Sequence, residues 1–219
     1  MHASQPEPTT AESGPRFVVQ KHWAHQLHYD FRLEIADRLV SWAIPKGPSL
    51  DPAVRRLAVR TADHPLSYSV FEGTIPAGQY GAGVVMVWDT GTYEPLLPAH
   101  VKPEAWLARG YLRFILHGKK LHGLWEMLRY QRSAAHQEPW LLIKLRDRYT
   151  QPGYDPESQP ASALSGRSHE EIARAGETPA VAPKLPVLPA GAVACTDPIL
   201  ESELSIPEDR ERAEGRLPE

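Results

Sequence analysis

The 219-residue chain contains a single cysteine, Cys195, and no apolar run long enough to span a bilayer. One cysteine excludes an internal disulfide and a metal cluster held by several thiolates. The polar, proline-containing N-terminus lacks the apolar stretch of a secretory signal. From these absences we expect a cytoplasmic protein with no membrane partner.

Large aromatic residues are missing from one end of the chain. Residues 151–219 contain no Trp and no Phe and hold 10 of the 22 prolines. Such a segment buries too little apolar surface to offset the entropy of ordering. We therefore expect a folded domain over residues 16–150, a flexible N-terminal arm over 1–15, and a Pro-rich, acidic, largely disordered tail over 151–219. Within this tail, Ser168 and Glu171 predict a capping box at the start of one short helix.

The net charge of −3 hides an uneven distribution. Residues 16–150 carry 18 Lys and Arg against 12 Asp and Glu, whereas the two ends carry 6 against 15. A basic body favours a polyanionic partner such as nucleic acid, although solvation alone also explains such a balance.

The dominant hydrophobic period between residues 16 and 150 is two. Alternating segments predict strands at residues 27–35, 38–44, 55–62, 84–94, 111–118 and 140–147, and we expect two further strands at 17–22 and 120–130. Lys102–Arg109 predicts a helix with Pro103 in its first turn. Many short strands separated by turns indicate a mainly all-β fold, a compact antiparallel β-barrel with few short helices, because closure removes exposed strand edges.

The segment HWAHQLHYDFRLE carries the densest chemical signal. His28, Asp30, Arg32 and Glu34 alternate, so one face of a strand would carry all four. With His22 from the preceding segment, two imidazoles and a carboxylate form a suitable ligand set for Mn²⁺, Zn²⁺ or Fe²⁺. Arg32 could hold a phosphate beside such a metal. The alternative is an ordinary Asp–Arg ion pair among structural histidines, and His25 falls outside the register of His28.

A second cluster, DHPLSYSVFEGTIPAGQYGAG, places His64 and Tyr68 near enough to share a pocket. Its glycines would let backbone N–H groups approach an anion, but the segment lacks the lysine of a P-loop, and glycine-rich loops are more often plain turns. An exposed aromatic residue here, such as Tyr80, could stack on a terminal base.

Seven segments carry a resemblance to a known family. FVVQKHWAHQLHYDFRLE is followed in order by SWAIPKGPS, RRLAV, DHPLSYSVFEGTIPAGQYGAG, VVMVWDTGTYEP, LHGKKLHGLW and WLLIKLRD. Together they resemble the 3′-phosphoesterase domain of bacterial DNA ligase D and its stand-alone relatives, over residues 16–148. The joint occurrence of HxxxxxHxDxR, DHPxxY and FEGxIPxGxYG is highly specific.

The resemblance implies a compact β-barrel with a crescent-shaped groove and an enzyme that heals DNA 3′ ends. Its substrates would be primer-template or duplex DNA with a 3′-phosphate or a 3′-terminal ribonucleotide. Family members remove the ribonucleoside first and the remaining 3′-phosphate second, which leaves a 3′-hydroxyl.

The resemblance also assigns roles to residues. The metal ligands correspond to His22, His28 and Asp30, with Mn²⁺ as the ion that the family prefers. The positions in and around the catalytic site correspond to Gln20, Arg32, Lys46, Arg56, His64 and Tyr68. The basic balance of the body adds Arg55, Lys119 and Lys120 as candidates for contacts with the substrate strand.

One departure from the family concerns the N-terminus. Members commonly carry an Arg-Asp-Phe segment ahead of Pro-Glu-Pro, and here Pro6-Glu7-Pro8 is present without it. The resemblance therefore favours the 3′-phosphatase step over ribonucleoside removal. Because the chain contains neither a ligase nor a polymerase domain, we expect ligation to depend on a partner such as a separate ligase, with Ku as a further candidate.

Three alternatives stay open at the level of sequence. The first is a metal phosphoesterase acting on RNA ends or free nucleotides. The second is a β-barrel module that binds nucleic-acid ends without catalysis. The third, a structural zinc protein, is disfavoured by the single cysteine.

Overall fold

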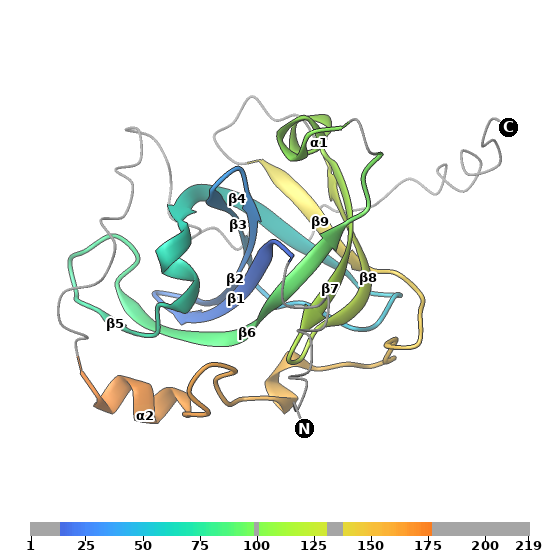
Figure 1. Cartoon of the computed structure of the whole chain (residues 1–219). Coiled ribbons are helices and arrows are strands. Elements are labelled where there is room, and N and C mark those ends of the chain that lie inside the picture. The colour runs from blue at the N-terminus through green and yellow to red at the C-terminus, as the bar shows by residue number, and fades with distance from the viewer. Residues whose placement is uncertain (1–13, 99–100, 131–137, 177–219) are drawn as a thin grey trace, which may run out of the picture.

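The computed structural model describes residues 14–98, 101–130 and 138–176 (Figure 1). The strands are β1 (Arg16–Trp23), β2 (Leu27–Ile35), β3 (Arg38–Ile44), β4 (Arg55–Pro65), β5 (Gly73–Ile75), β6 (Gly83–Pro95), β7 (Tyr111–Gly118), β8 (His122–Arg129) and β9 (Pro139–Lys144). The helices are α1 (Pro103–Arg109), α2 (His169–Arg174) and the 3₁₀-helices η2 (Leu66–Val70) and η3 (Pro156–Ser158). In the described part of the chain, no helix has the length and apolar character needed to cross a membrane.

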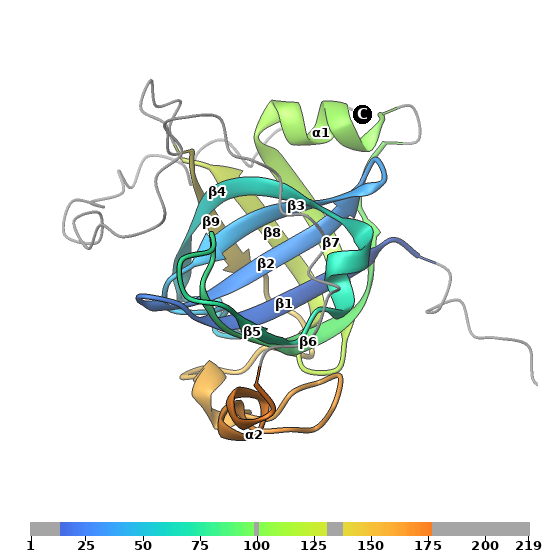
Figure 2. The ribbon, with the colours of Figure 1, turned by 90° about the vertical axis from the view of Figure 1, so that its left-hand side faces the viewer.

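Eight of the strands close into an antiparallel barrel. Their order is β1-β2-β3-β4-β9-β8-β7-β6, and β6 pairs back onto β1 (Figure 2). The three-residue strand β5 adds to the edge of β6 and is too short for a period of two to reveal, so its segment was expected to be a loop. The predicted mainly all-β antiparallel barrel with few short helices is confirmed.

Apolar side chains from all eight barrel strands fill the interior as one cluster. Its largest fully buried members include Trp42, Trp88, Trp125 and Trp140. Burying side chains of this size removes much apolar surface from water, which is the main stabilising term of such a fold.

Alternation along β2 decides which side chains face outward. Tyr29, Phe31 and Leu33 belong to the interior cluster. Asp30 and Arg32, between them, therefore lie on the outer face of the barrel. A second apolar cluster covers part of that outer face and takes side chains from β1, β3, β5, β6 and the segment around η2. The polar face of β2 is consequently buried beside an apolar cover instead of lying open to water.

Both predicted helices are present. Helix α1 has Pro103 in its first turn and ends at Gly110, whose φ of 75° is in the left-handed region that favours glycine. Helix α2 begins at Ser168, where the predicted capping box with Glu171 is complete.

The chain that packs on the barrel continues past the predicted boundary at residue 150, and its described part extends to residue 176. Strand β6 pairs with β5 at one end and β7 at the other, and Val87 lies between these pairings. Ala163 N donates to Val87 O at 2.8 Å. The buried Glu72 carboxylate accepts from Val87 N and from Arg167 Nη2, both at 3.1 Å. These contacts depend on the part of β6 around Val87, which pairs with neither β5 nor β7, and the composition of the sequence could not reveal them. The expected arm over residues 1–13 and the tail beyond 176 lie outside the described residues.

Candidate active site

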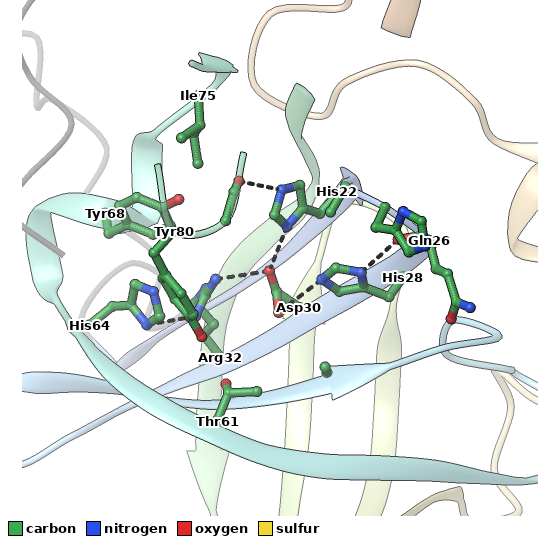
Figure 3. Close-up of a pocket in the computed structure, with 14 residues that line it drawn as sticks. His22, Gln26, His28, Asp30, Arg32, Thr61, His64, Tyr68, Ile75 and Tyr80 are labelled. Carbon is green, nitrogen blue, oxygen red and sulfur yellow. Dashed lines mark hydrogen bonds and ion pairs between the residues drawn. The ribbon is translucent and has the colours of Figure 1, made fainter. Parts of the chain in front are cut away.

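A pocket on the outer face of the barrel gathers most of the candidate residues (Figure 3). It lies over β1, β2 and β4 and is bordered by η2 and by the loop before β6. The polar and aromatic residues that line it are His22, His25, Gln26, His28, Asp30, Arg32, Thr61, His64, Tyr68 and Tyr80.

The three predicted metal ligands converge in this pocket. His22 on β1 and His28 on β2 are direct partners in the β-ladder, and Asp30 follows His28 on the same face. One ligand atom from each residue lies within 4.8 Å of the other two. His22 Nδ1 is 3.6 Å from Asp30 Oδ2, and His28 Nε2 is 3.8 Å from Asp30 Oδ1. Two strands thus bring together a donor set that a divalent transition metal accepts.

The second nitrogen of each imidazole is engaged by a backbone carbonyl. His22 Nε2 donates to Gly81 O at 2.9 Å, and His28 Nδ1 donates to Gln26 O at 3.0 Å. A carbonyl oxygen can only accept, so in the neutral rings these nitrogens carry the hydrogens. The remaining lone pairs, on His22 Nδ1 and His28 Nε2, are then the ones nearest Asp30. Metal-ligating histidines are commonly oriented in this way, so the residues present fit a bound metal ion.

Arg32 contacts the side-chain oxygens of three residues at once. Its Nη2 lies 3.0 Å from Asp30 Oδ2, its Nε donates to Gln20 Oε1 at 2.8 Å, and its Nη1 donates to Ser41 Oγ at 2.8 Å. The Arg32 side chain is only 3% exposed. A guanidinium with these three oxygen contacts presents a constant positive charge next to the candidate metal ligands.

His64 and Tyr68 share the pocket, as expected from their spacing. Their ring centroids are 4.8 Å apart, and the Arg32 guanidinium lies 5.2 Å from the centre of the Tyr68 ring. His64 Nδ1 is 2.8 Å from Arg32 Nη1 and 2.9 Å from Ala62 O. Because one nitrogen cannot accept from arginine and donate to a carbonyl simultaneously, the two contacts belong to different tautomers of His64.

The charges in the pocket are set by burial and by Arg32. Burial alone raises the pKa of the Asp30 carboxyl, but Arg32, followed by His28 and His22, outweighs burial and holds that pKa well below its usual range. Burial, and then the Arg32 charge, lower the pKa of His64 to about 3. Burial raises the pKa of Tyr68 to about 12. Near neutral pH, Asp30 is therefore ionised while the His64 ring and the Tyr68 hydroxyl are uncharged.

Replacing His64 by Gln is expected to make the fold less sensitive to acid. Folding lowers the pKa of His64 to about 3, whereas the unfolded chain takes up this proton near about pH 6.5. The stabilisation is complete above the unfolded value and is lost as pH falls toward the folded one. Urea unfolding of metal-free protein measures the free energy of unfolding at about pH 7 and at about pH 5. Between these two values, wild type should lose about 1–2 kcal/mol more of it than His64→Gln. The control is replacement of the exposed His25 by Gln; parallel curves for wild type and His64→Gln would contradict the expectation.

Two residues near Arg32 were not anticipated from the sequence, and of these only Thr61 lines the pocket. Ser41 on β3 is the ladder partner of Arg32, and Thr61 on β4 is the ladder partner of Ser41. Thr61 Oγ1 is buried without a hydrogen-bond partner among the described residues. The register of three adjacent strands puts them beside Arg32. A register prediction for the tight turn between β2 and β3 would have found Ser41.

Lys119 and Lys120, predicted to contact a substrate strand, lie at the turn between β7 and β8. Lys119 Nζ donates to Ala163 O at 2.6 Å, and Lys120 Nζ donates to Gln159 O at 2.8 Å. Burial lowers the pKa of Lys120 to about 8. Both ammonium groups therefore hold the segment that follows the barrel, and neither residue lines the pocket.

The other predicted basic residues also lie outside the pocket lining. Lys46 is exposed after β3, and Arg55 and Arg56 begin β4. Gln20 does not line the pocket either, but it contacts two residues that do. Its Nε2 donates to Tyr68 O at 3.1 Å, and its Oε1 accepts from Arg32. The roles predicted for these residues remain predictions.

Comparison with known proteins identifies a family and several relatives. The model of the DNA Ligase D 3′-phosphoesterase domain family matches residues 20–129. The multifunctional non-homologous end joining protein LigD of Pseudomonas aeruginosa is 53% identical over 132 residues, which cover 60% of this chain and 15% of that protein. The multifunctional non-homologous end joining DNA repair protein LigD of Mycobacterium tuberculosis is 41% identical over 145 residues, covering 66% and 18% respectively.

A third relative, the LigD of Mycolicibacterium smegmatis, is 39% identical over 151 residues. The chain spans between 15% and 19% of the length of these three relatives. The matched region contains every strand from β2 to β8 and all three candidate metal ligands. The chain therefore belongs to the DNA ligase D 3′-phosphoesterase domain family.

Proposed function

We propose that the chain is a metal-dependent phosphoesterase that removes the 3′-phosphate from DNA ends and leaves a 3′-hydroxyl. The observation that carries this proposal is the convergence of His22, His28 and Asp30 beside the guanidinium of Arg32. A metal next to a fixed guanidinium suits a phosphate ester, because both neutralise charge on its oxygens. The family is a DNA ligase domain family and the relatives are named as end-joining proteins, which supports DNA ends as the substrate.

His22, His28 and Asp30 would hold the ion, and we propose Mn²⁺, with other divalent transition metals as substitutes. The ion would act as a Lewis acid on a phosphoryl oxygen. Arg32 contributes a charge that needs no reorganisation when negative charge develops on the phosphate, since Gln20 and Ser41 already orient it.

His64 and Tyr68 supply neutral hydrogen-bonding groups on the other side of Arg32. The uncharged His64 ring keeps one N–H, and it can direct this hydrogen at a phosphoryl or leaving-group oxygen when Nδ1 accepts from Arg32. The Tyr68 hydroxyl stays protonated across the physiological range because burial raises its pKa to about 12. Both groups would therefore act as donors toward the phosphate.

Removal of metal is expected to abolish conversion of a primer-template with a 3′-phosphate. A gel assay with Mn²⁺ or with chelator would follow the appearance of the 3′-hydroxyl product. A parallel lane with one 3′-terminal ribonucleotide tests whether ribonucleoside removal, which the sequence disfavours, takes place.

Two outcomes would overturn the proposal in different directions. DNA that binds but is not converted with any divalent metal would point to a non-catalytic end-binding module. A clear preference for RNA ends with a 3′-phosphate would instead assign the activity to RNA. If the 3′-hydroxyl does form, sealing requires a further activity, and we propose a separate ligase as the partner, with Ku as a second candidate.

A further inference from the structure

Tyr80 is the exposed aromatic residue of the pocket. It lies in the loop between β5 and β6, lines the pocket, and is 46% exposed, whereas Tyr68 in the same pocket is 3% exposed. The interior and outer apolar clusters do not include Tyr80. Its ring is therefore available to a ligand and is not needed to fill the core.

The loop that carries Tyr80 is attached to the metal-ligand group. Gly81 O, on the residue after Tyr80, accepts from His22 Nε2 at 2.9 Å. Two turns shape the loop, through Gln79 N to Pro76 O at 3.2 Å and Ala82 N to Gln79 O at 3.1 Å. Gly81 has a φ of 74°, which other residues adopt with strain. These contacts hold the backbone of the loop at a defined place relative to His22.

The Tyr80 ring lines the same pocket as Arg32, the residue at which we expect a phosphate to bind. Figure 3 shows it extending from the loop toward Arg32 and Thr61. Burial raises the pKa of Tyr80, and the Asp30 charge raises it further, which agrees with a phenol close to that carboxylate. Among the described residues that line the pocket, Asp30 is the only carboxylate. A terminal nucleoside whose phosphate is held at Arg32 would therefore share this pocket with the Tyr80 ring.

We infer that Tyr80 positions the substrate by stacking its ring on the terminal base of the DNA 3′ end. This inference rests on the proposed function and adds a binding site for the terminal nucleoside. Stacking on an aromatic ring tolerates any base, since every base has a π-face. The site would thus recognise the presence of a terminal base without reading its identity, and the phenolic oxygen would not be required.

The test compares two 3′-phosphate primer-templates, one with a normal terminal nucleotide and one with an abasic terminal residue. Tyr80→Ala is expected to lower kcat/KM for the normal end by about 10-fold, the scale of one lost base–aromatic stack. It should leave kcat/KM for the abasic end within about 2-fold of wild type, and Tyr80→Phe should act as wild type on both. Tyr149→Ala, which replaces a 38% exposed tyrosine outside the pocket lining, is the matched control.

Fluorescence anisotropy measures binding of the same two ends to chelator-treated protein, and so tests the stacking role without depending on catalysis. If Tyr80→Ala binds the normal end more weakly than wild type does, and binds the abasic end equally well, stacking is supported. Failure of every variant to convert either end would overturn only the proposed function. The stacking role would be overturned if Tyr80→Ala lost affinity equally for both ends. It would also be overturned if Tyr80→Phe lost as much affinity as Tyr80→Ala. Thermal unfolding of each variant confirms that the comparison is made between folded proteins.

Discussion

Replacing Asp30 by Asn is expected to lower metal-dependent removal of the 3′-phosphate by at least about 100-fold. The amide keeps the shape of the side chain but loses the negative charge that lies between His22, His28 and Arg32. A divalent ion then meets two imidazoles and a nearby guanidinium without a charge to offset its own. Activity and Mn²⁺ affinity should therefore fall together.

Two measurements check this expectation. The gel assay reports conversion at saturating Mn²⁺, and titration calorimetry reports the affinity for Mn²⁺. Glu34→Gln is the matched control, because it removes a carboxylate from the same strand outside the pocket lining. An Asp30→Asn variant that binds Mn²⁺ as wild type does and still converts the substrate would remove Asp30 from the metal site.

Replacing Arg32 by Ala is expected to lower the free energy of unfolding by about 3–5 kcal/mol in metal-free protein. The Asp30 carboxylate is buried and would lose the partner 3.0 Å from its Oδ2. Gln20 Oε1 and Ser41 Oγ would also lose the donor that now reaches them. Each buried polar group left without a partner adds its desolvation cost, so the decrease in the free energy of unfolding exceeds that from breaking a surface ion pair.

Urea unfolding with chelator present measures the change. Arg32→Lys keeps the charge but cannot donate in three directions from a planar group, so its loss should be intermediate. Arg38→Ala breaks the exposed Arg38–Asp63 pair, at 3.3 Å, and should cost less than about 1 kcal/mol. Added Mn²⁺ should restore part of the stability of Arg32→Ala, because an ion that binds only the folded state stabilises it. Equal losses for Arg32→Ala and Arg38→Ala would show that the Arg32 network contributes little.

A hydrophobic period of two predicts those strands that have one apolar face and one more polar face. β2, β3 and β7 begin and end at the predicted residues because one face of each contacts the apolar interior and turns bound both ends. β5 lacks this signal, since three residues do not define a period. The packed segment after residue 150 lacks it as well, because it is held by hydrogen bonds to β6 and to lysines of the β7–β8 turn.

By itself, the sequence determined the all-β class and the shared strand face of His28, Asp30 and Arg32, because both follow from local alternation. Its motif order also determined the family, since several specific patterns occur together. Only the tertiary structure decided how His22 meets that face, which imidazole nitrogens remain free, and that Gln20 and Ser41 hold Arg32. It also decided that Lys119 and Lys120 lie away from the pocket and that Tyr80 lies over it. These features depend on ladder register and on loops packed from distant parts of the chain, which no local pattern specifies.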